Sequence, residues 1–293
     1  MRLFGQKERE ISTIAEDKAW EMAQQVIAAG AIKPEEFIDE PGYTEEEIKR
    51  DQKYVERIEK KIADEQTPEQ AESAKKAEVF EALLYDQTEK QNWLGQDTST
   101  IKTSRFDDIA NGVDMAVEVL PEDKPASHIG LAVDATFSND VDAKIKAILK
   151  SIDEGTMAHI KYFHSENTDD RKKLYKIPRV VIGAGADTVD SLAELWLRAS
   201  SKKADASVVK ESKETLRAHF IQFQILEQIL MQLHAFEAYA RRKGRDESAA
   251  IYHEAYEVFD EILQKKRKDK EVADSGRRDS VHYTLMTAIE NIR

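Results

Sequence analysis

The alternation of apolar and polar positions predicts a chain that begins with helices. Apolar residues recur at helical spacing over 10–30 and stop at Gly30, which suits a helix end. A second helix is predicted after Thr44, whose side chain and Glu47 form a capping-box pattern. A third helix begins at Thr67-Pro68, with the threonine as cap and the proline in the first turn.

In the middle of the chain the period changes from helical to strand-like. Segments 112–120 and 128–138 predict two strands, which a short loop joins as a hairpin. A helix over 139–155 follows, and then two more predicted strands at 157–165 and 179–185. Another helix is predicted at 187–200.

The last third of the chain is helical again. A long helix is predicted from about 205 to 243, followed by helices at 246–268 and 279–293. Residues 220–239 are apolar nearly all round, which predicts a buried helix that packs on the core or on a copy of itself.

Together these elements predict an α/β protein with a central mixed sheet of four or five strands. Helices flank the sheet and extend from both of its ends. We divide the chain into a helical N-terminal extension (1–70), an α/β core (71–200) and a helical C-terminal region (201–293).

Composition narrows the class of protein without changing this picture. Hydrophobic residues make up 41% and charged residues 34%, as in a folded, helix-rich protein. The chain has no cysteine, which excludes disulfides, thiolate metal sites and thiol nucleophiles. No apolar run reaches the roughly 18 to 20 residues of a membrane span, and the first residues lack a signal-peptide core. We therefore expect a cytoplasmic protein that does not enter a membrane.

The net charge of −13 argues against broad contact with nucleic acid, because phosphate repels acid. Basic clusters at 169–179, 240–245 and 264–270 nevertheless leave a local basic surface open. Each cluster fits a solvated surface of mixed charge equally well.

Two neighbouring predicted strands each carry an internal aspartate. Alternation along a strand places Asp114 beside Ala116 on one face, and Asp134 beside Gly130 and Ala132 on one face of the next strand. If the strands pair, the two carboxylates lie on one side, about 5 Å apart if directly opposed, and can share a cation. A solvent-facing side is the alternative, but residues this small indicate that something packs closely there.

At this point the sequence resembles the PD-(D/E)XK nuclease superfamily, the restriction-endonuclease-like proteins. The resemblance covers residues 75–190 and lies in the order acidic helix, strand with Asp, strand with Asp-x-x, helix, strand. It makes Glu81 the helix acid, with Glu78 as the substitute one turn earlier. Asp114 and Asp134 become the two strand acids.

The resemblance implies a site for Mg²⁺ or Mn²⁺. Mg²⁺ takes oxygen ligands and usually keeps several waters, so Asp114 and Asp134 suit it as ligands. Glu81 would bind directly or through water, and the backbone carbonyl of Ala135 would add another oxygen.

The chain departs from the superfamily motif at its lysine, because Thr136 stands two residues after the second acid. In some members the lysine has moved to the following helix, where this chain has Lys144 and Lys146. Lys161 on the next strand is a third candidate.

We therefore predict a metal-dependent nuclease acting on nucleic acid, with DNA favoured over RNA only by what is usual in the superfamily. The alternative is a protein that keeps the nuclease fold without cleavage and serves as a binding or assembly module. A homodimer through the C-terminal helices is expected mainly from the resemblance.

Two other features have simpler interpretations. Asp107 and Asp108 are expected to shape a turn with Asn111-Gly112, with contact to metal or a base as the alternative. The glycine-rich segment 180–188 suggests a dinucleotide site, but Thr188 replaces the third glycine. A tight turn with Asp187 as helix cap fits it better.

Overall fold

The computed structural model describes residues 2–120, 127–134, 140–165, 167–269 and 274–292, without the side chains of 2–14, 131–134 and 140. The helices are α1 (Arg2–Gly30), the 3-10 helix η1 (Pro34–Phe37), α2 (Glu45–Glu65), α3 (Pro68–Gln91), α4 (Arg105–Asn111), α5 (Asp140–Glu154), α6 (Ala186–Ser200), α7 (Ala206–Arg217), α8 (Ile221–Arg242), α9 (Asp246–Lys268) and α10 (Ser280–Glu290). The strands are β1 (Thr98–Lys102), β2 (Met115–Val119), β3 (Ser127–Asp134), β4 (Ala158–His164), β5 (Arg171–Ile177) and β6 (Arg179–Gly183).

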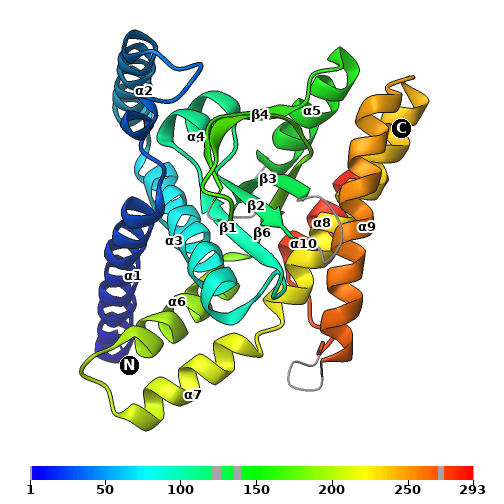
Figure 1. Cartoon of the computed structure of the whole chain (residues 1–293). Coiled ribbons are helices and arrows are strands. Elements are labelled where there is room, and N and C mark those ends of the chain that lie inside the picture. The colour runs from blue at the N-terminus through cyan, green and yellow to red at the C-terminus, as the bar shows by residue number, and fades with distance from the viewer. Residues whose placement is uncertain (1, 121–126, 135–139, 166, 270–273, 293) are drawn as a thin grey trace.

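A mixed four-stranded sheet lies at the centre, surrounded by helices (Figure 1). Its strand order is β1-β2-β3-β6, with antiparallel pairs β1–β2 and β2–β3 and a parallel pair β3–β6. The predicted hairpin of 112–120 with 128–138 is confirmed in the register Met115↔Leu131. The mixed α/β class with helical ends is also confirmed.

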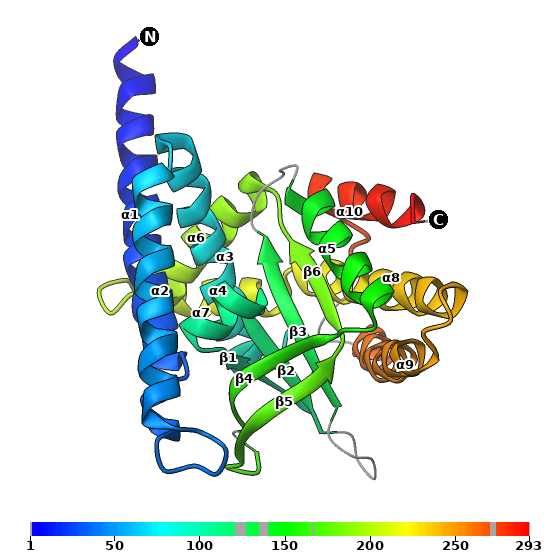
Figure 2. The same cartoon turned by 90° about the horizontal axis from the view of Figure 1, so that it is seen from above.

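Two strands were not predicted, and one predicted strand lies outside the central sheet. β1 and β5 are rich in Thr, Ser, Lys and Arg, so neither shows a clear apolar alternation. The strand predicted at 157–165 is β4, which pairs with β5 in a separate two-stranded sheet. Figure 2 shows this β4–β5 hairpin crossing over the central strands.

Strand β2 is buried on both faces, which explains the small residues next to Asp114. Met115, Val117 and Val119 face the main core, whereas Ala116 packs in a smaller cluster with Ile160 of the hairpin. A side chain at Gly130 would meet Val113 and Ile177 at 3.2 and 3.3 Å. The expectation that something packs closely on this face is confirmed, and the solvent-facing alternative is wrong here.

The free edge of β6 is covered by glutamine side chains of α8, not by another strand. Gln232 accepts a hydrogen bond from the Val181 N–H at 2.8 Å and donates to the Val181 carbonyl at 2.5 Å. One turn earlier, Gln228 binds both backbone groups of Gly183, at 2.9 and 3.0 Å. Helix α8 therefore supplies the hydrogen bonds that a fifth strand would have made.

The helix predicted from about 205 to 243 is interrupted, and its apolar part is buried as expected. The break lies between α7 and α8, where the ring of His219 accepts the Ile221 N–H at 3.3 Å. Helix α8 packs against α9, β6 and α10. Contacts within the chain thus account for its apolar character, and the homodimer stays a prediction without support from this helix.

The first helices cover the opposite side of the core. Helix α1 lies along α3 and α6, and α2 contacts α4 (Figure 1). Thr44 and Thr67 cap α2 and α3 as predicted, through hydrogen bonds to their side-chain oxygens. In the described part of the chain, no helix is both long and apolar enough to cross a membrane.

Candidate functional site

Charged side chains gather where α3, β1, α4 and the start of β2 meet. Glu81 comes from α3, Lys102 from the end of β1, Asp108 from α4 and Asp114 from the residue before β2. The short helix α4 begins because Ser104 accepts the Asp107 N–H at 3.1 Å, and it ends at Gly112, whose φ of +63° favours glycine. We call Glu81, Lys102, Asp108 and Asp114 the acid cluster.

Lys102 is the buried cation of the acid cluster. Its side chain is 4% exposed, and its Nζ lies 2.8 Å from Glu81 Oε1 and 2.7 Å from the Asp114 carbonyl oxygen. Asp108 pairs with Arg105 at 2.5 Å and shares a hydrogen bond with the Asp114 carboxyl group. The cluster thus joins three acids to one lysine inside it and one arginine at its rim.

Burial and mutual repulsion divide the protons unequally among these acids. Burial raises the pKa of Asp114 well above its ordinary value, and the charges of Asp108 and Glu81 raise it further. Burial also raises the pKa of Glu81, against the effect of Lys102. Although burial acts against it, the charges of Lys102 and Arg105 lower the pKa of Asp108. A proton shared by the pair is therefore favoured on Asp114, whose carboxyl group is hydrogen-bonded to that of Asp108.

The Asp108–Asp114 pair opens into a pocket of about 500 Å³. Two cationic side chains line the same pocket, Lys144 of α5 and Arg179 of β6. Arg179 donates to the Asn111 carbonyl at 3.1 Å, and burial lowers its pKa. Paired carboxyl groups and two cations thus face one space.

Two of the predicted metal ligands come together here. Glu81 and Asp114 are linked through Lys102. Asp134 ends β3, and extending the β2–β3 register one step past Met115 puts Asp114 opposite Ala132. Position 134 is therefore diagonal to 114 on the same face, and the two positions are not directly opposed.

Other predicted site residues lie elsewhere or outside the described part. The side chain of Asp134 is not described, and Ala135 lies outside the described residues. Glu78, the substitute acid, accepts a hydrogen bond from the Trp20 indole at 2.6 Å instead.

The three candidate lysines lie in different places relative to the pocket of the Asp108–Asp114 pair. Lys144 lines the pocket, as noted, whereas Lys146 is exposed on α5 and does not line it. Lys161 on β4 pairs with Glu47 and Asp51 of α2, both at 2.5 Å. The structure therefore places only Lys144 of these lysines beside the carboxyl pair.

Asp107 and Asp108 bond the Asn111-Gly112 turn, as predicted. The Asp107 carboxylate accepts the Asn111 side-chain N–H at 2.7 Å, and the Asp108 carbonyl accepts the Gly112 N–H at 3.0 Å. Both aspartates lie in the first turn of α4, a helix that the sequence analysis did not identify. Asp108 belongs to the acid cluster. The carboxylate of Asp107 is fully buried and accepts the backbone N–H groups of Lys161 and Tyr162, at 2.6 and 3.0 Å. The spacing Ser104-x-x-Asp107 was the available signal, because it is typical of a helix start.

The residue set fits a divalent cation in part. Among the described side chains, no three acids or histidines are arranged to hold a metal ion. Glu81 already forms an ion pair with Lys102, so its carboxylate is engaged and is a poor metal ligand here. The Asp108–Asp114 pair does fit, because two hydrogen-bonded carboxyl groups offer the hard oxygen ligands that Mg²⁺ prefers, and a cation can replace their shared proton.

The glycine-rich segment after β6 is occupied by a carboxylate from the C-terminal part of the chain. The Gly185 N–H at the start of α6 donates to the Asp279 carboxylate at 2.8 Å. The N-cap of α6 is Gly185, so the prediction of Asp187 as cap is wrong. An internal carboxylate thus takes the position at which a dinucleotide phosphate would bind.

Comparison of the chain with protein-family models, with curated proteins and with solved structures gives no match.

Proposed function

We propose that the protein is a metal-dependent nuclease that hydrolyses phosphodiester bonds of nucleic acid, with DNA as the favoured substrate by resemblance. The observation that carries the proposal is the Asp108–Asp114 carboxyl pair, which shares one pocket with Lys144 and Arg179.

Each side chain of the pocket has a role in this proposal. Asp108 and Asp114, with Asp134 from the next strand, would hold Mg²⁺ or Mn²⁺. The bound ion would supply a water of lowered pKa and offset charge on the phosphodiester. Lys144 and Arg179 bind and orient the phosphate oxygens. Lys102 does not line this pocket and holds Glu81 and the Asp114 backbone in place.

The order of elements supports the same proposal. Acidic helix α3 precedes β2 with Asp114, β3 with Asp134, helix α5 and strand β6. This is the order on which the resemblance rests. The chain adds β1 and α4 before β2, and the β4–β5 hairpin before β6.

A nuclease fold without cleavage is the second candidate, and one observation favours it. The Lys102 ammonium lies between Glu81 and the Asp114 carbonyl, where it already compensates part of the acidic charge. Such a protein would still bind nucleic acid or a partner, with little need for a metal.

A cleavage assay separates the two candidates. Single- and double-stranded DNA and RNA are incubated with the protein and Mg²⁺ or Mn²⁺, and parallel samples contain chelator. We expect metal-dependent cleavage that Asp114→Asn abolishes and Lys144→Met reduces at least about tenfold. Lys146→Met, an exposed change on the same helix, is the control and leaves the rate unchanged.

Two outcomes would contradict the nuclease proposal. Equal cleavage by wild type and Asp114→Asn would indicate a contaminating nuclease. Absence of cleavage, together with no Mn²⁺ binding by calorimetry, would remove both the activity and the metal. Binding of DNA without cleavage would favour the second candidate.

A further inference from the structure

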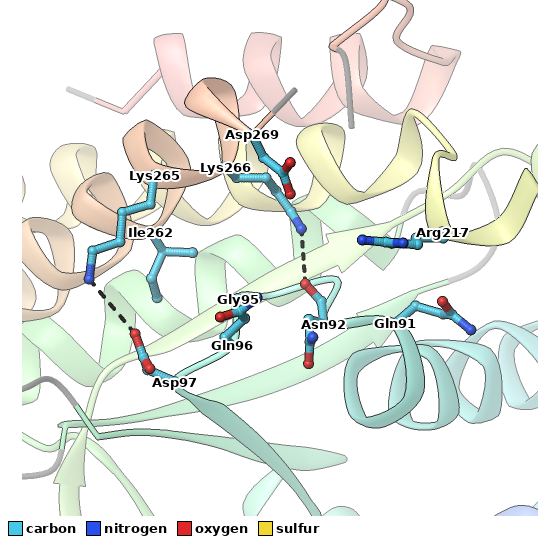
Figure 3. Close-up of a pocket in the computed structure, with 10 residues that line it drawn as sticks. All are labelled: Gln91, Asn92, Gly95, Gln96, Asp97, Arg217, Ile262, Lys265, Lys266 and Asp269. Carbon is cyan, nitrogen blue, oxygen red and sulfur yellow. Dashed lines mark hydrogen bonds and ion pairs between the residues drawn. The ribbon is translucent and has the colours of Figure 1, made fainter. Parts of the chain in front are cut away.

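A second pocket lies away from the acid cluster, where the C-terminal ends of α3, α7 and α9 meet (Figure 3). It has a volume of about 260 Å³. Its charged lining residues are Arg217, Lys265, Lys266, Asp97 and Asp269. These three cations against two carboxylates leave the lining with one excess positive charge.

Lys266 is the most buried of these cations. Its ammonium donates to the Asn92 carbonyl at 2.9 Å, which is its hydrogen-bond partner among the described residues. An ammonium has three N–H donors, so this contact uses one of the three in a side chain that lines the pocket. Figure 3 shows the Arg217 guanidinium reaching from α7 toward the space beside the Lys266 amine.

The remaining charges do not neutralise Lys266. Lys265 points the other way and pairs with Glu261 at 3.2 Å and with Asp97 at 3.7 Å. Asp269 raises the pKa of Lys266, but burial outweighs it and lowers that pKa to about 8. The protein therefore keeps an incompletely compensated amine in this pocket, and a bound anion would stabilise its charged form.

A purely structural role explains only part of this arrangement. Cations at helix C-termini are stabilised by the exposed carbonyl groups, which accounts for the bond from Lys266 to Asn92 after α3. It does not account for an adjoining pocket, nor for a second cation from α7 directed at the same space.

We propose that this pocket binds a small oxyanion, a phosphate or a carboxylate group, between Lys266 and Arg217. Lys266 supplies a half-buried point charge, and the guanidinium of Arg217 has the geometry to donate to two oxygens. The site shares no lining residue with the pocket of the Asp108–Asp114 pair. It is therefore independent of the proposed nuclease activity.

The test is calorimetric titration of the full chain with inorganic phosphate and, separately, with acetate, at constant ionic strength. We expect wild type to bind one of them at a single site. Lys266→Met and Arg217→Gln should each weaken binding at least about tenfold, since each removes a charge-assisted hydrogen bond. Lys268→Met removes an equal charge from an exposed position on α9 that does not line the pocket, and it should change affinity less than about twofold.

The outcomes decide both the site and the ligand. Tighter binding of phosphate assigns a phosphate ligand, and tighter binding of acetate assigns a carboxylate. Absence of binding by both, or equal weakening by Lys266→Met and Lys268→Met, overturns the proposal. If Lys266→Met does not fold, as judged by circular dichroism, Arg217→Gln carries the test alone.

Discussion

A single buried lysine determines the charge balance of the acid cluster. Burial disfavours the charged form of Lys102, but Glu81, Asp108 and Asp114 together raise its pKa above the ordinary value. The acids therefore keep Lys102 charged in a place that water hardly reaches. Removing either side leaves uncompensated charge, which is costly in a protein interior.

The first prediction concerns Lys102 itself. Lys102→Met should lower the free energy of unfolding by about 3 to 5 kcal/mol at pH 7, because Glu81 and Asp108 then lose their buried cation. Urea unfolding measures the change. Lys146→Met, at an exposed position, is the control and should stay within about 0.5 kcal/mol of wild type. A Lys102→Met protein as stable as wild type would show that the acids are compensated from elsewhere.

The second prediction concerns the proton on Asp114. Since the pKa of Asp114 is raised on folding, the folded protein holds a proton that the unfolded chain releases above about pH 4. Its contribution to stability is therefore lost as pH rises toward the raised pKa. Asp114→Asn cannot ionise, so its stability relative to wild type should increase with pH when metal is absent.

Asp108→Asn provides the opposite trend as a control. The pKa of Asp108 is lowered on folding, so its contribution is present above about pH 4 and is lost at more acidic pH. Asp108→Asn should thus be least stable, relative to wild type, near neutral pH. Urea unfolding from pH 3 to 8 measures both series, and parallel trends would contradict the unequal sharing of the proton.

The sequence predicts only some residues of the acid cluster, and there is a physical reason why it misses the others. Asp114 stands out because strand alternation places it among small residues. Lys102 ends a polar strand without clear alternation, and Asp108 lies in a helix of only seven residues. Their roles arise from packing between α3, β1 and α4, which local patterns do not encode.

At the scale of elements, the contact between α8 and the edge of β6 is the feature that the sequence predicts least. Gln224, Gln228 and Gln232 repeat at four-residue spacing, so they lie on one face of α8. All three are fully buried, which is unusual for glutamine. Gln228 and Gln232 bond backbone groups of β6 that an edge strand would otherwise leave unpaired, and Gln224 bonds both the Gly183 carbonyl and Asp279.

The third prediction tests this contact. Gln232→Leu should destabilise the protein by about 2 to 4 kcal/mol, because the Val181 N–H and carbonyl lose their partners and each buried orphan costs about 1 to 3 kcal/mol. Gln264→Leu, at an exposed position of α9, is the matched control and should be near neutral. Equal unfolding curves for the two variants would mean that water reaches the β6 edge.

Helix α8 also shows what an apolar pattern can and cannot predict. The pattern over 220–239 correctly predicted burial. It left open whether the partner was the core or a second copy, because both remove the same apolar surface from water. The glutamine spacing was present in the sequence, but only the position of β6 gives it meaning.

At the scale of the whole molecule, the segment from 201 onward belongs to the main core. Buried residues of α8 and α9 share one apolar cluster with α3, α5 and β6. The C-terminal part of the chain also closes the turn after β6 through Asp279. The predicted boundaries near 70 and 200 therefore mark changes of pattern along the sequence.

The fourth prediction follows from this shared core. A fragment of residues 71–200 should fail to fold, because it lacks α8 and leaves the β6 edge and one side of the core exposed. Circular dichroism and cooperative urea unfolding measure this, with the full chain as control. A fragment that unfolds cooperatively would show that 71–200 is an independent unit.

The sequence was sufficient for the fold class and for the central hairpin, because apolar alternation and helix caps are local. It was insufficient for the second sheet, because β5 is mostly charged and is stabilised by pairing with β4. The closure of β6 by side chains from α8 joins segments about 50 residues apart in the chain, and no local pattern announces such a contact.

The Asp107 carboxylate links strand β4 to α4, the helix that contributes Asp108 to the acid cluster. It accepts hydrogen bonds from two consecutive N–H groups of β4, and it belongs to α4 itself. The side chains of Lys161 and Tyr162 in β4 both bind Asp51 of α2. Asp107 and Asp51 thus join α4, β4 and α2 in one continuous set of hydrogen bonds, which fixes the helix that carries Asp108 relative to the outer helix α2.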